Sequence, residues 1–227
     1  MNPTKPFTFY LTFAIIVCFE TLFASWLDLD WIHYISKPLI VISLTLYFWT
    51  HSKHLKTNIK TLTVLALVFS LFGDVLLLFV NQSQYFFILG LLAFLVAHVM
   101  YSFAFLKQRN KSKKPFGFIA LLVLYALGLF WLLKSGLNAL LIPVILYMLV
   151  ILAMATSAFL REQKVNTQSY YLVFWGALFF MISDSLLALN KFYSPLPFAD
   201  FSIMFTYALA QLLIVTGLIN KGTKKAP

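Results

Sequence analysis

The sequence predicts an all-α membrane protein: a single integral membrane domain over residues 1–227, folded as a polytopic bundle of eight transmembrane helices. Hydrophobic residues make up 62% of the chain and charged residues only 11%, whereas a soluble domain carries about 25% charged residues. The apolar residues gather into long runs. These runs lack the apolar–polar alternation of β-barrel strands, so helices are expected.

Eight segments meet or approach the length of about 20 mostly apolar residues that a membrane helix needs. They are residues 7–24, 32–49, 61–80, 85–106, 116–133, 139–160, 170–189 and 199–220. The first segment lacks a small-residue cleavage site and is interrupted by Glu20, so we expect a retained helix rather than a signal peptide. Glu20 lies one turn from the outer end of this segment, where its carboxylate is expected to reach the interface.

The distribution of Lys and Arg predicts the orientation. With eight spans, all but three of the 17 Lys and Arg residues fall on one side, the exceptions being Lys37, Lys134 and Lys191. Basic residues concentrate on the cytoplasmic side, so both termini are predicted to be cytoplasmic, in the inner membrane of a bacterium. The net charge of +10 then reflects orientation in the membrane and not nucleic-acid binding. Cys18 is the single cysteine, which excludes an internal disulfide and a cysteine-based metal cluster.

Two aspartates lie inside otherwise apolar runs. Asp74 follows Gly73 and is separated by one residue from a Leu pair, and the same arrangement returns at Ser183-Asp184. An ionisable residue at membrane depth costs roughly 2.5–3.5 kcal/mol on insertion scales and usually faces the bundle interior. Both spans run outward from the cytoplasm, and a rise of 1.5 Å per residue places each aspartate about 8–9 Å from its outer end. We therefore expect the two carboxylates at matching depth, where they can share a cavity.

The fourth span carries His98 and Tyr101 on one helix face with Gly90 and Phe94. The same rise places His98 about 20 Å below the outer end, deeper than the aspartates by two or more turns. A buried histidine can be a structural hydrogen-bonding group or a catalytic one, and both interpretations stay open. No His spacing typical of a zinc site is present, so no metal is expected.

Further candidates lie on other spans. Lys37, followed by Pro38 at the head of the second span, is either a snorkelling lysine or a group that binds an anion. Tyr147, Tyr207 and Gln211 can serve a site or form hydrogen bonds between helices.

Together these pieces resemble the YhhN-like family of integral membrane proteins, whose characterised members include the lysoplasmalogenases. In chain order they are Lys37-Pro38-Leu39; Gly73-Asp74 with Leu76-Leu77; Phe87 to Gly90 with Phe94, His98 and Tyr101; Tyr147 with Met154; Gly176 to Phe179 with Ser183-Asp184; and Tyr207 with Gln211. The resemblance covers residues 37–211. It implies a membrane enzyme that cleaves the vinyl ether bond of lysoplasmalogen, a lysophospholipid, to give a fatty aldehyde and a glycerophospho-headgroup. Membrane lipid is the other expected partner, and no obligate protein partner is evident.

The residues suit this chemistry. Protonation of the β-carbon of a vinyl ether gives an oxocarbenium ion, which water converts to a hemiacetal. A buried carboxyl group beside a second one can remain protonated near neutral pH, and paired carboxyl groups serve oxocarbenium chemistry in glycoside hydrolysis. Asp74 and Asp184 are the candidate acid and base, in an order that stays open, and His98 and Tyr101 would orient one of them or the leaving oxygen. Lys37 is the candidate for binding the phosphate, and Ser183 and Gln211 are the candidates for positioning water. No metal or organic cofactor is required.

Two other functions remain as alternatives. A proton-coupled carrier of small molecules or lipids would also place two aspartates and a histidine in the bundle. Helices broken by Gly or Pro would favour such a carrier, and only Pro143 is expected inside a span beyond its first turns. A structural protein would use the aspartates to join helices. We favour the enzyme because ionisable residues at membrane depth usually mark a functional site.

Overall fold

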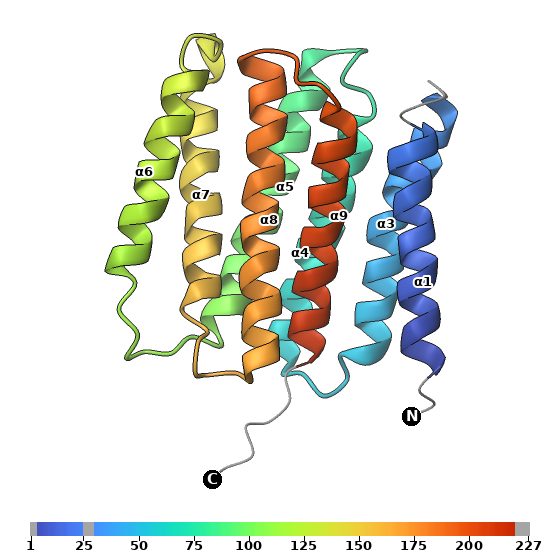
Figure 1. Cartoon of the computed structure of the whole chain (residues 1–227), viewed down its shortest axis with the longest axis vertical. Helices are drawn as coiled ribbons and strands as arrows, with labels where there is room; N and C mark the ends of the chain where they lie inside the picture. Colours follow the sequence, from blue (N-terminus) through green and yellow to red (C-terminus); the bar gives the residue numbers. More distant parts are fainter. Residues whose placement is uncertain (1–3, 25–29, 221–227) are drawn as a thin grey trace.

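The computed structural model describes residues 4–24 and 30–220, which form a bundle of helices running along a common axis (Figure 1). The helices are α1 (Thr4–Cys18) with the π-helix η1 (Phe19–Ala24), α3 (Asp30–His51), α4 (Thr57–Leu77), α5 (Gln84–Leu106), α6 (Phe116–Leu133), the short η2 (Asn138–Leu140), α7 (Leu141–Phe159), α8 (Thr167–Phe192) and α9 (Ala199–Ile219). No strand occurs among these residues, so the all-α class is confirmed. α1 and α3 lie at one edge of the bundle and α6 at the other (Figure 1).

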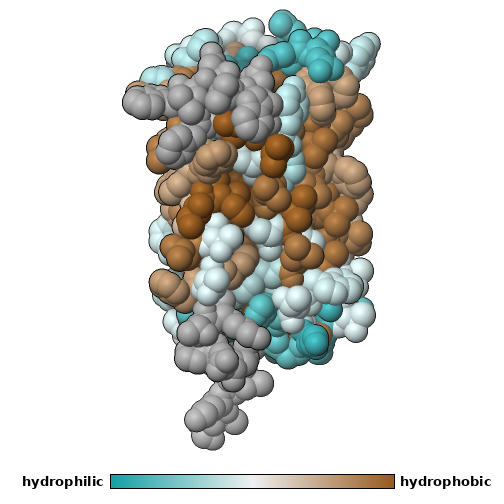
Figure 2. All heavy atoms as spheres, turned by 90° about the vertical axis from the view of Figure 1, so that its right-hand side faces the viewer, coloured by the Kyte–Doolittle hydropathy of each residue, from teal (hydrophilic) through white to brown (hydrophobic). Residues whose placement is uncertain are grey.

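Length and hydropathy identify seven helices in the described ranges that can cross a membrane. The N-terminal segment differs from the other expected spans, because its apolar helix, Phe7–Leu22, is shorter. Figure 2 shows a broad apolar band across the middle of one face, with hydrophilic residues toward the two ends. The protein is therefore an integral membrane protein. Lys221, Lys224 and Lys225, which contribute to the predicted charge asymmetry, lie outside the described residues.

Helix boundaries depend on local capping that hydropathy does not report. α8 is longer at both ends than the predicted span 170–189, and its N-cap Asn166 accepts a 2.6 Å hydrogen bond from the backbone N–H of Ser169. This contact satisfies an amide of the first turn that has no partner within the helix.

α3 also begins earlier than predicted, so Lys37 and Pro38 lie about two turns inside it. The expectation that Pro38 stands at the head of a span is therefore wrong.

A buried carboxylate joins the N-terminal helix to α3. The side chain of Glu20 is only 1% exposed; it accepts a hydrogen bond from the Ser36 hydroxyl, and Nδ1 of His33 lies 2.9 Å from its Oε1. The expectation that Glu20 reaches the membrane interface is wrong, because polar groups of α3 supply the partners that water would otherwise provide.

Glycines allow close approach of the helices that carry the aspartates. A Cβ at Gly73 would lie 2.6 Å from the Phe94 ring, so the packing of α4 against α5 requires glycine there. A Cβ at Gly176 would lie 2.8 Å from the Ile214 side chain, so α8 and α9 also approach each other closely there. Small residues permit such backbone approach between membrane helices.

Candidate functional site

Asp74 of α4 and Asp184 of α8 line one polar cavity with a volume of about 440 Å³. α4 and α8 run in the same direction from the same end of the bundle (Figure 1). The side chain of Asp74 is 1% exposed and that of Asp184 is 14% exposed. The structure thus brings together the two carboxyl groups that the depth comparison paired.

Each carboxylate accepts a hydrogen bond from one tyrosine. The hydroxyl of Tyr207, on α9, donates to Oδ2 of Asp74 at 2.8 Å. The hydroxyl of Tyr147, on α7, donates to Oδ2 of Asp184 at 2.7 Å. Within the described residues, no hydrogen bond reaches Oδ1 of either carboxyl group. Each acid is therefore held by one oxygen while the other remains available for chemistry.

His98 lies beside Asp184, with 3.5 Å between its Nε2 and Oδ2 of the carboxylate. The imidazole is fully buried, packs edge-on against Phe180 at 4.5 Å between ring centroids, and makes no hydrogen bond in the described structure. The expectation that His98 lies two or more turns deeper than the aspartates is therefore wrong. Side chains lean toward the N-terminus of their own helix. Because α5 and α8 run in opposite directions, these two side chains lean toward each other and close the difference in Cα height.

Tyr101 and Gln211 form a hydrogen-bonded layer behind the cavity. The Tyr101 hydroxyl donates to Oε1 of Gln211 at 2.6 Å. The Gln211 amide then donates to the Ser70 hydroxyl at 2.9 Å and to the Tyr207 hydroxyl at 3.3 Å. Both side chains are fully buried, and neither lines the cavity. They are placed to hold Tyr207, and through it Asp74, rather than to touch a ligand in the cavity.

Lys37 and Ser183 both line the cavity. The Ser183 hydroxyl donates to the carbonyl of Ile203 at 2.9 Å, so its proton is used in joining α8 to α9. Its oxygen retains lone pairs that can accept from water. The positions of Lys37 and Ser183 are compatible with the roles suggested from sequence.

Several further polar residues line the same cavity and were not predicted as site residues from the sequence. They are Asn81, Asn190, Lys191 and Asp200. Lys191 follows Asp184 by seven residues, which is two turns of α8 and therefore the same face; that spacing was the signal. Its Nζ lies 5.2 Å from the centroid of the Phe87 ring. Lys37 and Lys191 give the cavity two ammonium groups that can face an anionic ligand.

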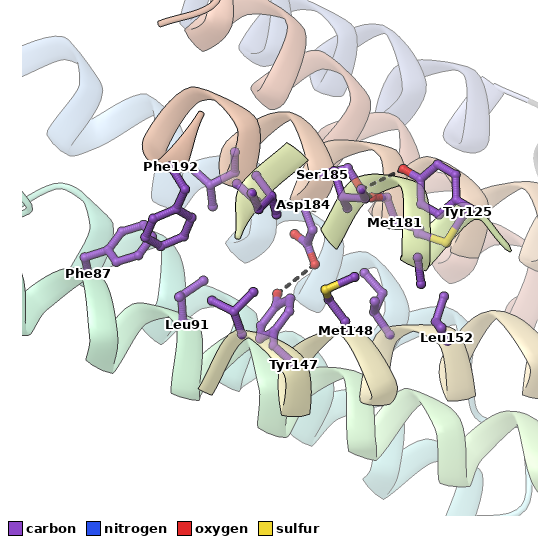
Figure 3. A pocket seen from close by; sticks show the side chains of 17 residues that line it. Phe87, Leu91, Tyr125, Tyr147, Met148, Leu152, Met181, Asp184, Ser185 and Phe192 are labelled. Atoms are coloured by element: carbon purple, nitrogen blue, oxygen red, sulfur yellow. Dashed lines mark hydrogen bonds between the residues drawn. The ribbon is translucent and has the colours of Figure 1, made fainter. Parts of the chain in front are cut away.

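A second, apolar crevice adjoins the polar cavity (Figure 3). It lies between α5, α6, α7 and α8, with a volume of about 50 Å³, and Leu91, Leu129, Met148 and Leu152 are among its lining residues. In Figure 3 the Asp184 carboxylate points into this crevice and meets the Tyr147 hydroxyl. The Tyr125 hydroxyl donates to the Ser185 hydroxyl at 2.7 Å on the far side of the same space. Tyr147 thus lines the apolar crevice and not the polar cavity.

No three His, Cys, Asp or Glu side chains gather as a ligand set for a metal ion in the part of the chain that the structure describes. The arrangement offers two carboxyl groups, each bound by a phenol, in a polar cavity that also holds two lysines and Asp200 and that adjoins an apolar crevice at Asp184. Such a site can transfer protons to and from a ligand that has one polar and one apolar end.

Comparison with known proteins gives a consistent family. The chain is 33% identical over 209 residues to lysoplasmalogenase TMEM86A of Homo sapiens, an alignment that covers 87% of this chain and 84% of that protein. It is 30% identical over 207 residues to lysoplasmalogenase TMEM86B of Homo sapiens, with coverage of 89% and 84%. No solved structure shows a significant match. The YhhN family model matches residues 32–218, a range that contains both aspartates, and the chain therefore belongs to the YhhN family.

Proposed function

We propose that this protein is a membrane-embedded hydrolase that cleaves the vinyl ether bond of lysoplasmalogens by acid–base catalysis with Asp74 and Asp184. The observation that carries the proposal is that both carboxyl groups line one cavity, and that each is held through a single oxygen by a tyrosine. The names of the human relatives, lysoplasmalogenase TMEM86A and TMEM86B, support the substrate class.

The reaction adds one water across the vinyl ether. One carboxyl group gives its proton to the β-carbon of the double bond. The π electrons of that bond form the new C–H bond, and the carbon attached to oxygen becomes an oxocarbenium ion. The second group, as carboxylate, takes a proton from water while the water oxygen bonds to the cationic carbon. The resulting hemiacetal then breaks its bond to the glycerol oxygen, giving an aldehyde and an alcohol. General acid–base catalysis of this kind contributes typically 10²–10⁴-fold to a rate.

The partners of the two carboxyl groups prepare them for these roles. A bundle interior excludes most water, so electrostatic interactions there are stronger than in solution. Tyr147 and Tyr207 fix the orientation of Asp184 and Asp74 before the substrate binds, which lowers the cost of reorganisation during the reaction. His98 lies on the Asp184 side only, where it can adjust to the protonation state of that carboxyl group.

The polar cavity suits a phosphate headgroup. Lys37 and Lys191 line it together with Asn81, Asn190 and Asp200, and ammonium groups form charge-assisted hydrogen bonds with phosphate oxygens. In our proposal the phosphate lies between the two lysines, which places the glycerol ether next to the aspartates. The proposed setting is the inner membrane of a bacterium, with the termini in the cytoplasm.

The direct test is purified protein in detergent mixed with lysoplasmenylethanolamine, with fatty aldehyde measured by mass spectrometry. We expect aldehyde release by the wild type and its loss in a monodisperse Asp184→Asn variant. Glu162→Gln is the matched control, because this acid lies at the opposite end of α8 and pairs with Lys113. A wild-type sample that is monodisperse and releases no aldehyde would refute the substrate assignment.

A further inference from the structure

Asp184 stands at the junction of two different cavities, whereas Asp74 does not. The polar cavity and the apolar crevice share Phe87, Asp184 and Leu187 in their walls. Asp74 lines the polar cavity alone. The two catalytic candidates therefore have different surroundings. In a ligand that occupies both spaces, the part at the junction lies beside Asp184 and the part in the polar cavity lies beside Asp74.

Helix α6 forms one wall of the crevice, and most of its side chains are not buried. Along α6 only Leu122 and Leu133 are buried, and a Cβ added at Gly128 would meet nothing within 4 Å. A hydrogen bond of 2.7 Å from Tyr125 to Ser185 connects the middle of α6 to the residue that follows Asp184. α6 stands at the edge of the bundle (Figure 1), and Tyr125, Ala126, Leu129 and Leu133 form its wall of the crevice.

We propose that the substrate lies across this junction, with its headgroup in the polar cavity and its alkenyl chain leaving through the crevice beneath α6. This rests on the proposed function. The occupant is indicated by continuity: the crevice is walled by apolar side chains except at Tyr125, Tyr147, Asp184 and Ser185. Its volume of about 50 Å³ receives the carbons next to the vinyl ether. The rest of the chain then runs along α6 into lipid.

This orientation assigns the two aspartates. In a vinyl ether the β-carbon carries the alkyl chain, and the other vinyl carbon is bonded to the glycerol oxygen. The β-carbon therefore lies on the crevice side of the junction, next to Asp184. Asp184 is the acid that protonates this carbon, and Asp74, on the headgroup side, takes the proton from water.

The crevice can be tested by filling it. Ala126 of α6 lines the crevice, whereas Ala120 on the same helix is exposed and lies outside it. Ala126→Phe should lower kcat/KM roughly tenfold for a hexadecenyl substrate, as expected for extra bulk in a packed space, and leave an ethenyl analogue, which has no carbon beyond the vinyl group, nearly unaffected. Ala120→Phe, the matched control, should leave both values unchanged. An Ala126→Phe variant with the wild-type ratio of the two substrates would contradict the crevice assignment.

Binding separates this inference from the proposed function. A 1-O-alkyl lysophospholipid with a diazirine in its chain is not a vinyl ether, so labelling does not require turnover. Photolabelling of the wild type should mark residues 125–129 of α6 and 148–152 of α7. Labelling of these residues, combined with no aldehyde release from lysoplasmenylethanolamine in a separate assay, would support the crevice and refute the reaction. Aldehyde release with labels elsewhere would do the reverse.

Hydrogen exchange tests the division of roles. In D₂O, an Asp74→Asn variant retains the carbon acid but lacks the base for water, so the oxocarbenium ion returns to substrate and deuterium accumulates at the β-carbon of recovered lipid. Asp184→Asn should show no such exchange. Exchange in Asp184→Asn, in both variants or in neither would overturn the assignment of Asp184 as the carbon acid.

Discussion

The hydroxyl of Tyr207 donates a 2.8 Å hydrogen bond to Oδ2 of Asp74, across 133 positions of the chain. The Tyr207 hydroxyl also accepts a hydrogen bond from the amide nitrogen of Gln211, and the amide oxygen of Gln211 accepts one from the Tyr101 hydroxyl. Asp74 is thereby connected to Tyr207 and Gln211 of α9 and to Tyr101 of α5. Of these three side chains, Tyr207 alone lines the cavity.

Tyr207→Phe should lower kcat while the protein remains folded. A hydrogen bond to a charged group contributes about 1.5–3 kcal/mol, so the rate should fall roughly 10- to 100-fold. Initial rates of aldehyde release measure the effect. Tyr171→Phe, on the exposed face of α8, is the control, and equal activity of the two variants would remove Tyr207 from the mechanism.

His98→Gln should reduce kcat more than it raises KM. His98 lies 3.5 Å from Asp184 but lines neither the polar cavity nor the apolar crevice, so it acts on the carboxyl group rather than on bound lipid. The kcat and KM values from full saturation curves separate these effects. His51→Gln, at the end of α3, should change neither. If His98→Gln raised KM alone, a direct contact with substrate would be indicated instead.

Lys37→Gln and Lys191→Gln should each raise KM about tenfold for a phospholipid substrate, because each removes an ammonium group from the cavity that we assign to the phosphate. kcat should change little. An alkenylglycerol without phosphate provides the comparison, since its KM should be the same in wild type and variants. Lys134→Gln, on an exposed residue after α6, is the matched control. Loss of binding to the phosphate-free lipid as well would contradict the headgroup assignment.

Arg161→Met should destabilise the protein without altering turnover per folded molecule. Arg161 is fully buried after α7 and donates to Gln108 at 2.7 and 3.0 Å and to Ser169 at 2.9 and 3.1 Å. Burial lowers the pKa of Arg161 to about 9, so it remains a cation at neutral pH. Its removal leaves buried acceptors without partners, at a cost of about 1–3 kcal/mol each. The melting temperature in detergent should fall well below that of Arg109→Met, an exposed residue of the same region.

The predicted orientation can be measured with two serines in exposed loops at opposite ends of the bundle, Ser112 and Ser194. In a Cys18→Ser background, Ser194→Cys should react with an impermeant maleimide in intact spheroplasts. Ser112→Cys, in the basic loop before α6, should react only after permeabilisation. The reverse pattern would place the termini outside.

The pairing of Asp74 with Asp184 was predictable from sequence because it depends on one helix at a time: each lies five or six residues before the end of its predicted span, and the fixed rise of a helix converts that number into height. Their equal depth stays a prediction, because Asp74 lies three residues before the end of α4 and Asp184 eight before the end of α8, while both carboxyl groups line one cavity. Tyr207 and Gln211 were predictable neighbours for the same reason, since an i, i+4 spacing places them on one face. The lysines of the polar cavity were only partly predicted: Lys37 was a candidate, whereas Lys191, which shares the face of Asp184, was not assigned to the site.

The contacts between helices required the tertiary structure. Hydropathy and spacing do not specify how far each helix rotates about its axis or which helix lies beside it, and in lipid every outward face is equally apolar. For this reason the meeting of His98 with Asp184, and the separate tyrosine partner of each carboxyl group, were not available from sequence. The sequence by itself determined a helical membrane protein with two acidic residues inside apolar helices. Helix packing decided that Asp184 borders both an apolar crevice and a polar cavity while Asp74 borders only the latter, because that difference depends on where α6 stands relative to α8.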